Sequence, residues 1–322
     1  MLALASPASL KGVLSPQEAA SLLAAGMRRV PGVEVDELPV ADGGEGTAAV
    51  IQEALGGTWY SAKVVDALGR PVTAEWLLLD NATAIVESAQ AIGLPLLKRS
   101  ERDPLRTTSR GLGELLLATL AKRPAALLVC VGGTATVDGG AAMREVVGEQ
   151  LRGLPVRVLC DVRNPLLGAR GAARVFGPQK GARPEAVEVL EARLAALEEL
   201  APYRDLPGAG AGGGLGAALA ALGAELVEGA EVVLDTIGFD DRARNADLVV
   251  TGEGTVDATT LEGKAPGAVV RRCERLGVRC ELFGGYVRSG MRAHALSGRR
   301  ARAGDDLLRL GEELAATLVG AG

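Results

Sequence analysis

The chain has 322 residues, a formal net charge of −5 and a hydrophobic content of 48%. This length predicts two domains, and this hydrophobic content is sufficient for a full core. The acidic balance argues against nucleic acid as a main partner, and no apolar run approaches the roughly 18 residues of a membrane span.

The first half of the chain alternates expected strands and helices. A serine followed by proline and an apolar stripe predicts a helix over residues 15–30, with Ser15 as its N-cap. A glycine-rich loop at 42–47 is expected to open a helix that runs to about residue 55. Alternating residues on either side of a turn at 66–71 predict a β-hairpin over 57–79. The remaining expected strands here are residues 1–5, 33–39 and 84–87.

A strand–loop–helix pattern occurs twice in the remainder. Apolar runs at 126–131 and 246–251 are each followed by a glycine-rich loop (132–138 and 252–261) and then by a helix (139–148 and 266–276). Strands buried on both faces and followed by helices indicate a parallel sheet. We therefore expect an α/β protein of two domains: a doubly wound parallel sheet of the flavodoxin or Rossmann type, and a second, mixed α/β lobe.

The domain boundaries expected from this pattern are discontinuous. The parallel lobe would comprise residues 1–56, 101–148 and 240–322. The second lobe would comprise 57–100 and 149–239, with a strand at 156–160, a charged helix at 185–200 and a glycine-rich loop at 206–216. Ligands of open α/β sheets bind beyond the carboxyl ends of the strands, so we expect the active site in a cleft between the lobes.

Lysine is rare in this chain, with six lysines against 29 arginines. Three of the six, Lys11, Lys180 and Lys264, stand next to a glycine. A compact ammonium beside a close backbone suits the binding of a phosphate or a carboxylate, and the recurrence favours ligand anions over chance.

Carboxylates also recur in glycine-rich loops. Asp42, Glu45, Asp138, Glu253 and Asp257 all lie within such loops. Each could hold Mg²⁺ or take a proton from a hydroxyl, and each could instead cap the helix that follows. Three acidic loops together with three glycine-flanked lysines favour phosphoryl transfer, which depends on positioning, Mg²⁺ and cations and does not require histidine.

Several other chemistries are excluded or disfavoured. His294 is the only histidine, so a Ser-His-Asp triad or a histidine metal cluster is not expected. The four cysteines show no CxxC spacing, which fits a reduced cytoplasm without disulfides or zinc, and Cys130 is expected in the core. The stretch 208–213 formally matches GxGxxG, but it follows a polar, proline-broken segment instead of a buried strand, which argues against an oxidoreductase. Its Gly210, Gly212 and Gly213 remain candidates for holding phosphate or for a structural turn.

These segments resemble the type I glycerate kinase family from about residue 6 to residue 270. The stretches that carry the resemblance are PVADGGEGT (39–47), DALGRPV (66–72), TTSRGLGELL (107–116), VGGTATVDGG (131–140), FGPQKGA (176–182), DLPGAGAGGGLGAAL (205–219), VVTGEGTVD (249–257) and LEGKAP (261–266). The resemblance implies ATP-dependent phosphorylation of D-glycerate with Mg²⁺, with 2-phosphoglycerate as the favoured product. It further implies a cytoplasmic enzyme whose partners are D-glycerate and ATP, without nucleic acid or membrane, and compatible with a homodimer.

The resemblance also implies roles for single residues. Asp42 or Asp138 would be the base for the glycerate hydroxyl. Lys11 would be a further catalytic residue, and Lys11 and Lys264 would contact phosphate or carboxylate. Glu253 and Asp257 would hold the metal. The residues expected to bind substrate or nucleotide are Glu45, Thr134, Thr136, Lys180, Gly210, Gly212, Gly213, Glu253 and Lys264.

Four features depart from the family pattern. Ala8 and Arg163 stand where the family has aspartates, Val137 stands where it has asparagine, and the connection over 148–156 is short. Arg163 and the short connection motivate a kinase for another small hydroxy acid. Ala8 and Arg163 motivate a catalytically silent, ligand-binding paralogue.

Overall fold

The computed structural model describes residues 1–320, apart from the side chain of Glu262. The chain forms two compact units. Unit 1 comprises Met1–Asp42 and the described chain from Ala230 onward, and unit 2 comprises Gly43–Gly229. The expected class is confirmed, because one unit contains an all-parallel sheet and the other a mixed sheet.

Unit 1 is built on a parallel sheet with the strand order β11-β10-β9-β1-β2. Its elements are β1 (Leu2–Ala5), α1 (Pro16–Met27), β2 (Glu34–Glu37), α9 (Gly229–Thr236, which begins at the last residue of unit 2), α10 (Phe239–Arg244), β9 (Leu248–Val256), η5 (Ala258–Glu262), α11 (Ala265–Leu276), β10 (Cys280–Val287), β11 (His294–Ala295), η6 (Arg300–Arg302) and α12 (Ala303–Gly320).

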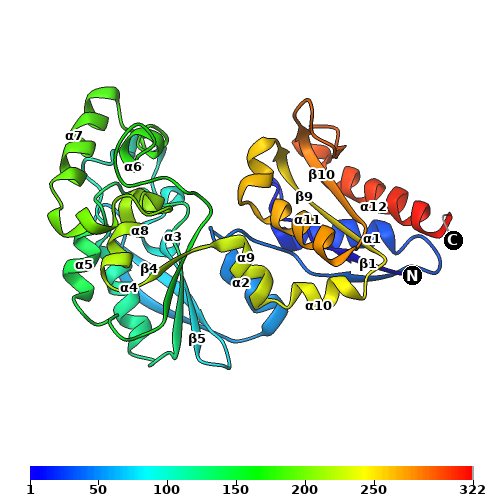
Figure 1. The fold of residues 1–322 in the computed structure, drawn as a ribbon, viewed down its shortest axis with the longest axis horizontal. Coiled ribbons are helices and arrows are strands. Elements are labelled where there is room, and N and C mark those ends of the chain that lie inside the picture. Colours follow the sequence, from blue (N-terminus) through cyan, green and yellow to red (C-terminus); the bar gives the residue numbers. More distant parts are fainter. Residues whose placement is uncertain (321–322) are drawn as a thin grey trace. The chain divides into compact units, whose positions relative to one another are not determined.

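Helix α1 begins as its sequence predicts. The hydroxyl of Ser15 accepts a hydrogen bond from the backbone N–H of Glu18, and the Glu18 carboxylate accepts one from the N–H of Ser15. Helices α1 and α12 lie side by side (Figure 1). Gly26 and Gly311 permit this close approach, since a Cβ on Gly26 would lie 2.0 Å from the carbonyl oxygen of Leu308.

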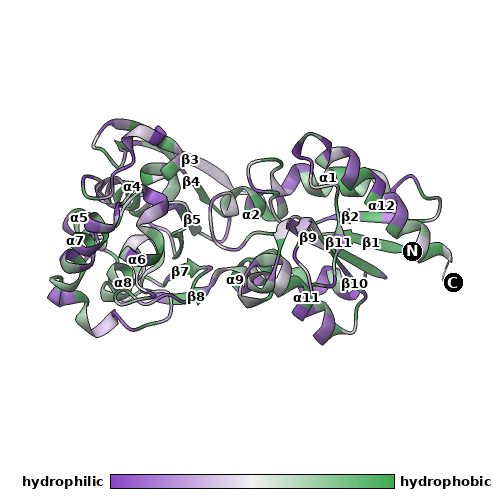
Figure 2. Ribbon diagram, turned by 90° about the horizontal axis from the view of Figure 1, so that it is seen from above, coloured by the Kyte–Doolittle hydropathy of each residue, from purple (hydrophilic) through white to green (hydrophobic). Residues whose placement is uncertain are grey.

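The core of unit 1 lies between this helix pair and the sheet. Strand β1 is hydrophobic along its length, whereas α1 and α12 carry both hydrophobic and hydrophilic residues (Figure 2). The inward-facing residues include Ala3, Leu23, Leu248, Phe283 and Leu307, all fully buried. A helix that is apolar on one face only is stabilised by burying that face against a sheet.

Unit 2 is built on a mixed sheet with the strand order β3-β4-β5-β6-β7-β8. Its elements are α2 (Thr47–Leu55), β3 (Thr58–Val65), β4 (Pro71–Leu78), β5 (Thr83–Glu87), α3 (Ser88–Ile92), η1 (Leu94–Leu96), η2 (Arg99–Glu101), α4 (Arg110–Leu120), β6 (Ala126–Cys130), α5 (Ala141–Val147), β7 (Val156–Cys160), α6 (Ala172–Phe176), η3 (Pro178–Lys180), α7 (Pro184–Ala195), η4 (Glu198–Tyr203), α8 (Ala211–Ala221) and β8 (Glu225–Glu228).

The expected hairpin is the antiparallel pair β3 and β4, and the strands from β5 to β8 run parallel. The carboxylate of Asp66 organises the hairpin turn by accepting hydrogen bonds from the backbone N–H groups of Leu68 and Arg70. Such a local Asx turn accounts for why the turn could be placed from sequence. Cys130, at the end of β6, is buried as expected.

The two units differ from the domain division expected from sequence. Residues 43–56 and 101–148 belong to unit 2, and residues 230–239 belong to unit 1. The reason is strand pairing: β6 pairs with β5 and β7, not with a strand of the other sheet. The strand–loop–helix patterns that contain β6 and β9 look alike in sequence but belong to different sheets. Residues 321–322 of the expected range lie outside the described residues.

Strand β9 is longer than expected. It continues to Val256, where a loop from residue 252 was predicted, because Glu253 and Thr255 pair with Gly284 and Tyr286 of β10. Glu253 is therefore held on a strand, which restricts the direction of its carboxylate. Among the described residues, no helix is long and apolar enough to cross a membrane.

Candidate functional site

The predicted residues fall into two sets, one in each unit. Unit 1 carries Lys11, Asp42, Glu253, Asp257 and Lys264, and these residues follow or end the parallel strands β1, β2 and β9 or precede α11. Carboxyl ends of parallel strands lie at one edge of a sheet, where ligands of open α/β folds bind. Lys11 is exposed. Its backbone lies close to β9, since a Cβ on Gly254 would be 3.4 Å from the backbone nitrogen of Lys11.

Glu253 and Lys264 are the best-defined charged pair of unit 1. The Lys264 ammonium lies 3.3 Å and 3.2 Å from the two carboxylate oxygens of Glu253, and the hydroxyl of Thr260 donates to one of them at 2.7 Å. Burial raises the pKa of Glu253, opposed by Thr260 and Lys264, and the negative charge of Asp42 raises it further. Two carboxylates that repel one another beside an ammonium are a suitable setting for a cation and a phosphate.

Asp257 has a clear local role. One of its oxygens accepts hydrogen bonds from the N–H and the hydroxyl of Thr259, at 2.9 Å and 2.6 Å, and thereby caps η5. The hydrogen bond from the Thr259 hydroxyl is the main cause of the lowered pKa of Asp257. Asp257 therefore follows the helix-capping alternative given above for the acidic loops. One of its two carboxylate oxygens is hydrogen-bonded to its own chain.

The carboxylates of the described residues limit how a magnesium ion could be bound. Among the described residues, no group of three or more His, Cys, Asp or Glu side chains could hold a metal ion. A magnesium ion in a kinase commonly uses only one or two carboxylates together with water and substrate phosphates. Glu253 and the nearby charge of Asp42 fit that smaller requirement.

In unit 2, the predicted residues gather at the carboxyl end of β6. Thr134, Thr136 and Asp138 lie in the loop between β6 and α5, and Lys180 ends η3. The Lys180 ammonium donates to the hydroxyl of Thr134 at 3.0 Å and to the backbone carbonyl of Thr136 at 2.8 Å. The structure thus brings together three residues that sequence reasoning assigned to ligand binding, and all three are buried.

Asp138 is surrounded by protein donors. One oxygen accepts from the N–H and the hydroxyl of Ser109, at 2.8 Å and 2.7 Å, and the other accepts from the N–H of Gly140 at 3.1 Å. The Ser109 hydroxyl in turn accepts from the N–H of Met143. Burial raises the pKa of Asp138, and these hydrogen bonds oppose that shift. The network joins the beginnings of α4 and α5, which favours a role for Asp138 in positioning the loop.

Glu87, at the end of β5, is a residue that sequence reasoning missed. Its carboxylate accepts hydrogen bonds from the N–H groups of Gly46 and Ala48, at 3.2 Å and 2.7 Å, and so holds the loop that carries Glu45 to the start of α2. Burial raises the pKa of Glu87, and the charge of Glu45 adds to the shift. A single acidic residue closing the apolar run TAIVE was the available signal.

The glycine-rich segment is explained mainly by close packing. Gly212, Gly213 and Gly214 all have positive φ, and a Cβ on Gly213 would lie 2.0 Å from the carbonyl oxygen of Thr136. The Gly213 and Gly214 N–H groups donate to the carbonyl of Gly210, and the carbonyl of Gly213 accepts from Gly139. These contacts pack the glycine-rich segment against the loop that carries Thr136. Phosphate binding by these glycines stays a prediction.

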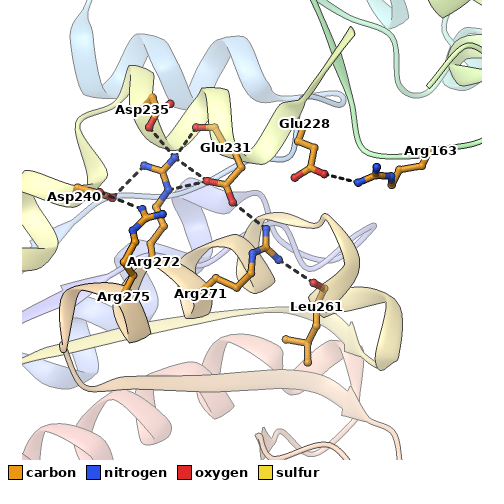
Figure 3. A network of polar contacts seen from close by, with 9 residues as sticks. All are labelled: Arg163, Glu228, Glu231, Asp235, Asp240, Leu261, Arg271, Arg272 and Arg275. Atoms are coloured by element: carbon orange, nitrogen blue, oxygen red, sulfur yellow. Dashed lines mark hydrogen bonds and ion pairs between the residues drawn. The ribbon is translucent and has the colours of Figure 1, made fainter. Parts of the chain in front are cut away.

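Arg163, one of the departures noted above, pairs with Glu228 at 3.0 Å on the surface of unit 2 (Figure 3). Its positive charge is therefore matched by a neighbouring carboxylate. Figure 3 also shows Arg272, a nearly buried guanidinium in unit 1 that binds Glu231, Asp235 and Asp240. That cluster ties α9 and α10 to α11 and has a structural role.

The chain is similar to known proteins over most of its length. The sequence profile of the glycerate kinase family matches residues 3–153 and 145–303. A glycerate kinase of Bacillus subtilis (strain 168) is 38% identical over 311 residues, covering 84% of this chain and 81% of the relative. A glycerate 2-kinase of Escherichia coli (strain K12) is 38% identical over 299 residues, covering 81% of this chain and 78% of the relative.

A solved structure agrees with these matches. The crystal structure of a protein assigned as glycerate kinase 2 from Salmonella typhimurium LT2 superposes with a TM-score of 0.83 at 34% identity, covering 100% of this chain and 99% of the other. The match therefore extends over both units and over both sets of predicted residues. The chain belongs to the glycerate kinase family.

Proposed function

We propose that this protein is an ATP-dependent kinase that phosphorylates D-glycerate, with 2-phosphoglycerate as the product. The observation that carries the proposal is the relatedness over most of the chain to proteins named glycerate kinase, including one named glycerate 2-kinase. The charged residues at the strand ends are consistent with phosphoryl transfer, which needs positioned cations and carboxylates.

In the proposed reaction, Asp42 is the base that accepts the proton of the glycerate hydroxyl. Asp138, whose oxygens accept hydrogen bonds from Ser109 and Gly140, is the alternative base. Lys264 and Lys11 supply positive charge to the phosphates or to the carboxylate of the substrate. Thr134 and Thr136 are assigned to the binding of an anionic oxygen.

Magnesium fits the carboxylates of unit 1. Glu253, with the nearby charge of Asp42, would hold the ion, and Asp257 remains a further predicted ligand. When bound, Mg²⁺ would neutralise charge on the phosphate oxygens of ATP. Lys264 balances the Glu253 carboxylate and keeps it oriented along β9.

The test is ADP release from Mg-ATP in the presence of D-glycerate, with the product coupled directly to enolase. Glycerate-dependent ADP that enolase can use supports a 2-phosphoglycerate-forming kinase, because enolase consumes this isomer without a mutase. A reaction without D-glycerate and the Asp42→Asn variant are the controls.

Two other outcomes are informative. A different hydroxy acid preferred over D-glycerate by about tenfold in kcat/KM would indicate a related kinase with another substrate. Stabilisation against heat by ATP without any turnover would indicate a silent, ligand-binding paralogue. The ion pair of Arg163 with Glu228 shows how the charge reversal at position 163 is accommodated within unit 2.

A further inference from the structure

Lys180 is a buried cation whose contacts are directed at the predicted ligand loop. Lys180 and Thr134 are only 4% and 3% exposed, so the ammonium does not project into solvent. Instead it donates to the Thr134 hydroxyl at 3.0 Å and to the Thr136 carbonyl at 2.8 Å. A Cβ on Gly133, next to Thr134, would lie 3.6 Å from a carboxylate oxygen of Glu45. Thr134 therefore bonds to Lys180 and directly follows a residue that lies near the Glu45 side chain.

The protonation state of Lys180 decides what the Thr134 hydroxyl can do. An ammonium has three N–H donors and no acceptor. While Lys180 is charged, the hydroxyl oxygen of Thr134 must accept, and the hydroxyl proton is available for another acceptor. A neutral amine has a lone pair, so it could take the hydroxyl proton of Thr134 for itself.

The surroundings of Lys180 make both states accessible near neutral pH. Burial lowers the pKa of Lys180 to about 7, against a smaller opposing effect of the Asp138 carboxylate. Other charged residues on the segments packed around η3 include Arg102, whose backbone lies against Gly181 and which is followed by Asp103, and Arg174 of α6, which pairs with Glu188. The carboxylate whose charge acts on the ammonium is that of Asp138.

We propose that Lys180 is a positioning residue that, when protonated, commits the Thr134 hydroxyl to donate to an anionic oxygen of the ligand, and that binding of D-glycerate draws a proton onto Lys180. The ligand in this inference rests on the proposed function. The carboxylate of D-glycerate is ionised at neutral pH, and an anion held next to Thr134 favours the charged form of Lys180. Binding of D-glycerate should then weaken as the pH rises above 7.

The first experiment measures proton uptake on the wild-type protein. D-glycerate is titrated by calorimetry at pH 8 in HEPES and in Tris, whose ionisation enthalpies differ, without ATP, because ATP itself titrates near neutrality. We expect uptake approaching about one proton for each glycerate bound, and a dissociation constant that increases about tenfold or more between pH 7 and pH 9. Binding without proton uptake, in a protein that turns over glycerate, would overturn the inference and leave the proposed function intact.

Variants assign the proton to Lys180. Lys180→Met should abolish the uptake and lower the affinity, whereas Lys180→Arg, which stays charged, should abolish the uptake and make the affinity independent of pH. Thr134→Val should weaken binding, and Thr134→Ser should restore it together with the uptake. An unchanged uptake in Lys180→Met would place the proton elsewhere and refute the assignment.

A direct titration covers the case in which the Lys180 variants do not fold. The chain has only six lysines, so the Cε resonance of Lys180 can be followed by NMR against pH in wild-type protein with and without D-glycerate. We expect a midpoint near 7 that moves upward with ligand. A lysine that stays charged to pH 9 without ligand, or a midpoint that does not move, would overturn the inference. Absence of glycerate-dependent ADP release would instead overturn the proposed function, and the ligand named here with it.

Discussion

Lys264 contacts both carboxylate oxygens of Glu253, at 3.3 Å and 3.2 Å, although the two residues are separated by η5 in the chain. The contact links the end of β9 to the start of α11, and Thr260 of η5 donates to the same carboxylate. An ammonium held by a partly buried carboxylate is preorganised, so little side-chain entropy is lost when a phosphate binds it.

We expect Lys264→Met to lower kcat/KM for Mg-ATP by about 10–100-fold, which corresponds to the loss of a charge-assisted hydrogen bond of about 1.5–3 kcal/mol. The measurement is steady-state kinetics with ATP varied at saturating D-glycerate. Lys63→Met is the matched control, because Lys63 is an exposed lysine on β3. Similar kinetics of the two variants would rule out a phosphate contact by Lys264.

The assignment of the base makes opposite predictions for two aspartates. Asp42→Asn should lower kcat by about 10²–10⁴-fold, the usual cost of losing a general base. Asp138→Asn should retain more than about a tenth of kcat but lower the melting temperature, because it disturbs the bonds to Ser109 and Gly140. The two variants are compared by kcat at saturating substrates and by thermal unfolding. The reverse ranking in kcat would make Asp138 the base.

Glu87 makes a prediction about pH and stability. Burial raises the pKa of Glu87 above its ordinary value of 4.5, so the folded state favours the neutral acid. Its contribution to stability is therefore present below pH 4.5 and is lost as the pH rises through the folded pKa. Gln cannot ionise, so the unfolding free energy of Glu87→Gln minus that of the wild type should increase as the pH rises through this window.

Urea unfolding followed by tryptophan fluorescence measures this difference. The two tryptophans of the chain, Trp59 and Trp76, both lie in unit 2, as does Glu87, so the signal reports on the relevant unit. Glu75→Gln, at an exposed position on β4, should show no such pH dependence. A difference between Glu87→Gln and wild type that stays constant from pH 4 to pH 8 would contradict the prediction.

The packing of the glycine-rich segment predicts a large effect of one methyl group. Gly213→Ala would place its Cβ 2.0 Å from the Thr136 carbonyl oxygen at a positive φ, so we expect a loss of more than about 3 kcal/mol of stability or failure to fold. Gly223→Ala is the matched control, since φ at Gly223 is also positive but no atom lies within 4 Å of its Cβ. Gly223→Ala should lower the free energy of unfolding by only about 1 kcal/mol. Equal stability of the two variants, measured by urea unfolding, would contradict the packing argument.

The sequence by itself determined the class of the fold, most of the local elements and the family. The Ser15 capping box, the Asp66 turn and the apolar runs of β6 and β9 depend on residues close together in the chain, so their signals are local. The lysines and carboxylates beside glycine marked the candidate site, and the family motifs pointed to glycerate.

Only the tertiary structure decided which sheet each strand joins and what each polar group of the site contacts. Strand β6 could have paired in either sheet, since strand pairing depends on residues far apart in the chain. Asp138, Lys180 and Glu87 have the residue types of ligand-binding groups, yet each is bonded to its own chain, and Lys180 and Glu87 are also buried. Burial and hydrogen-bond partners come from long-range packing, which a local pattern of residues does not encode.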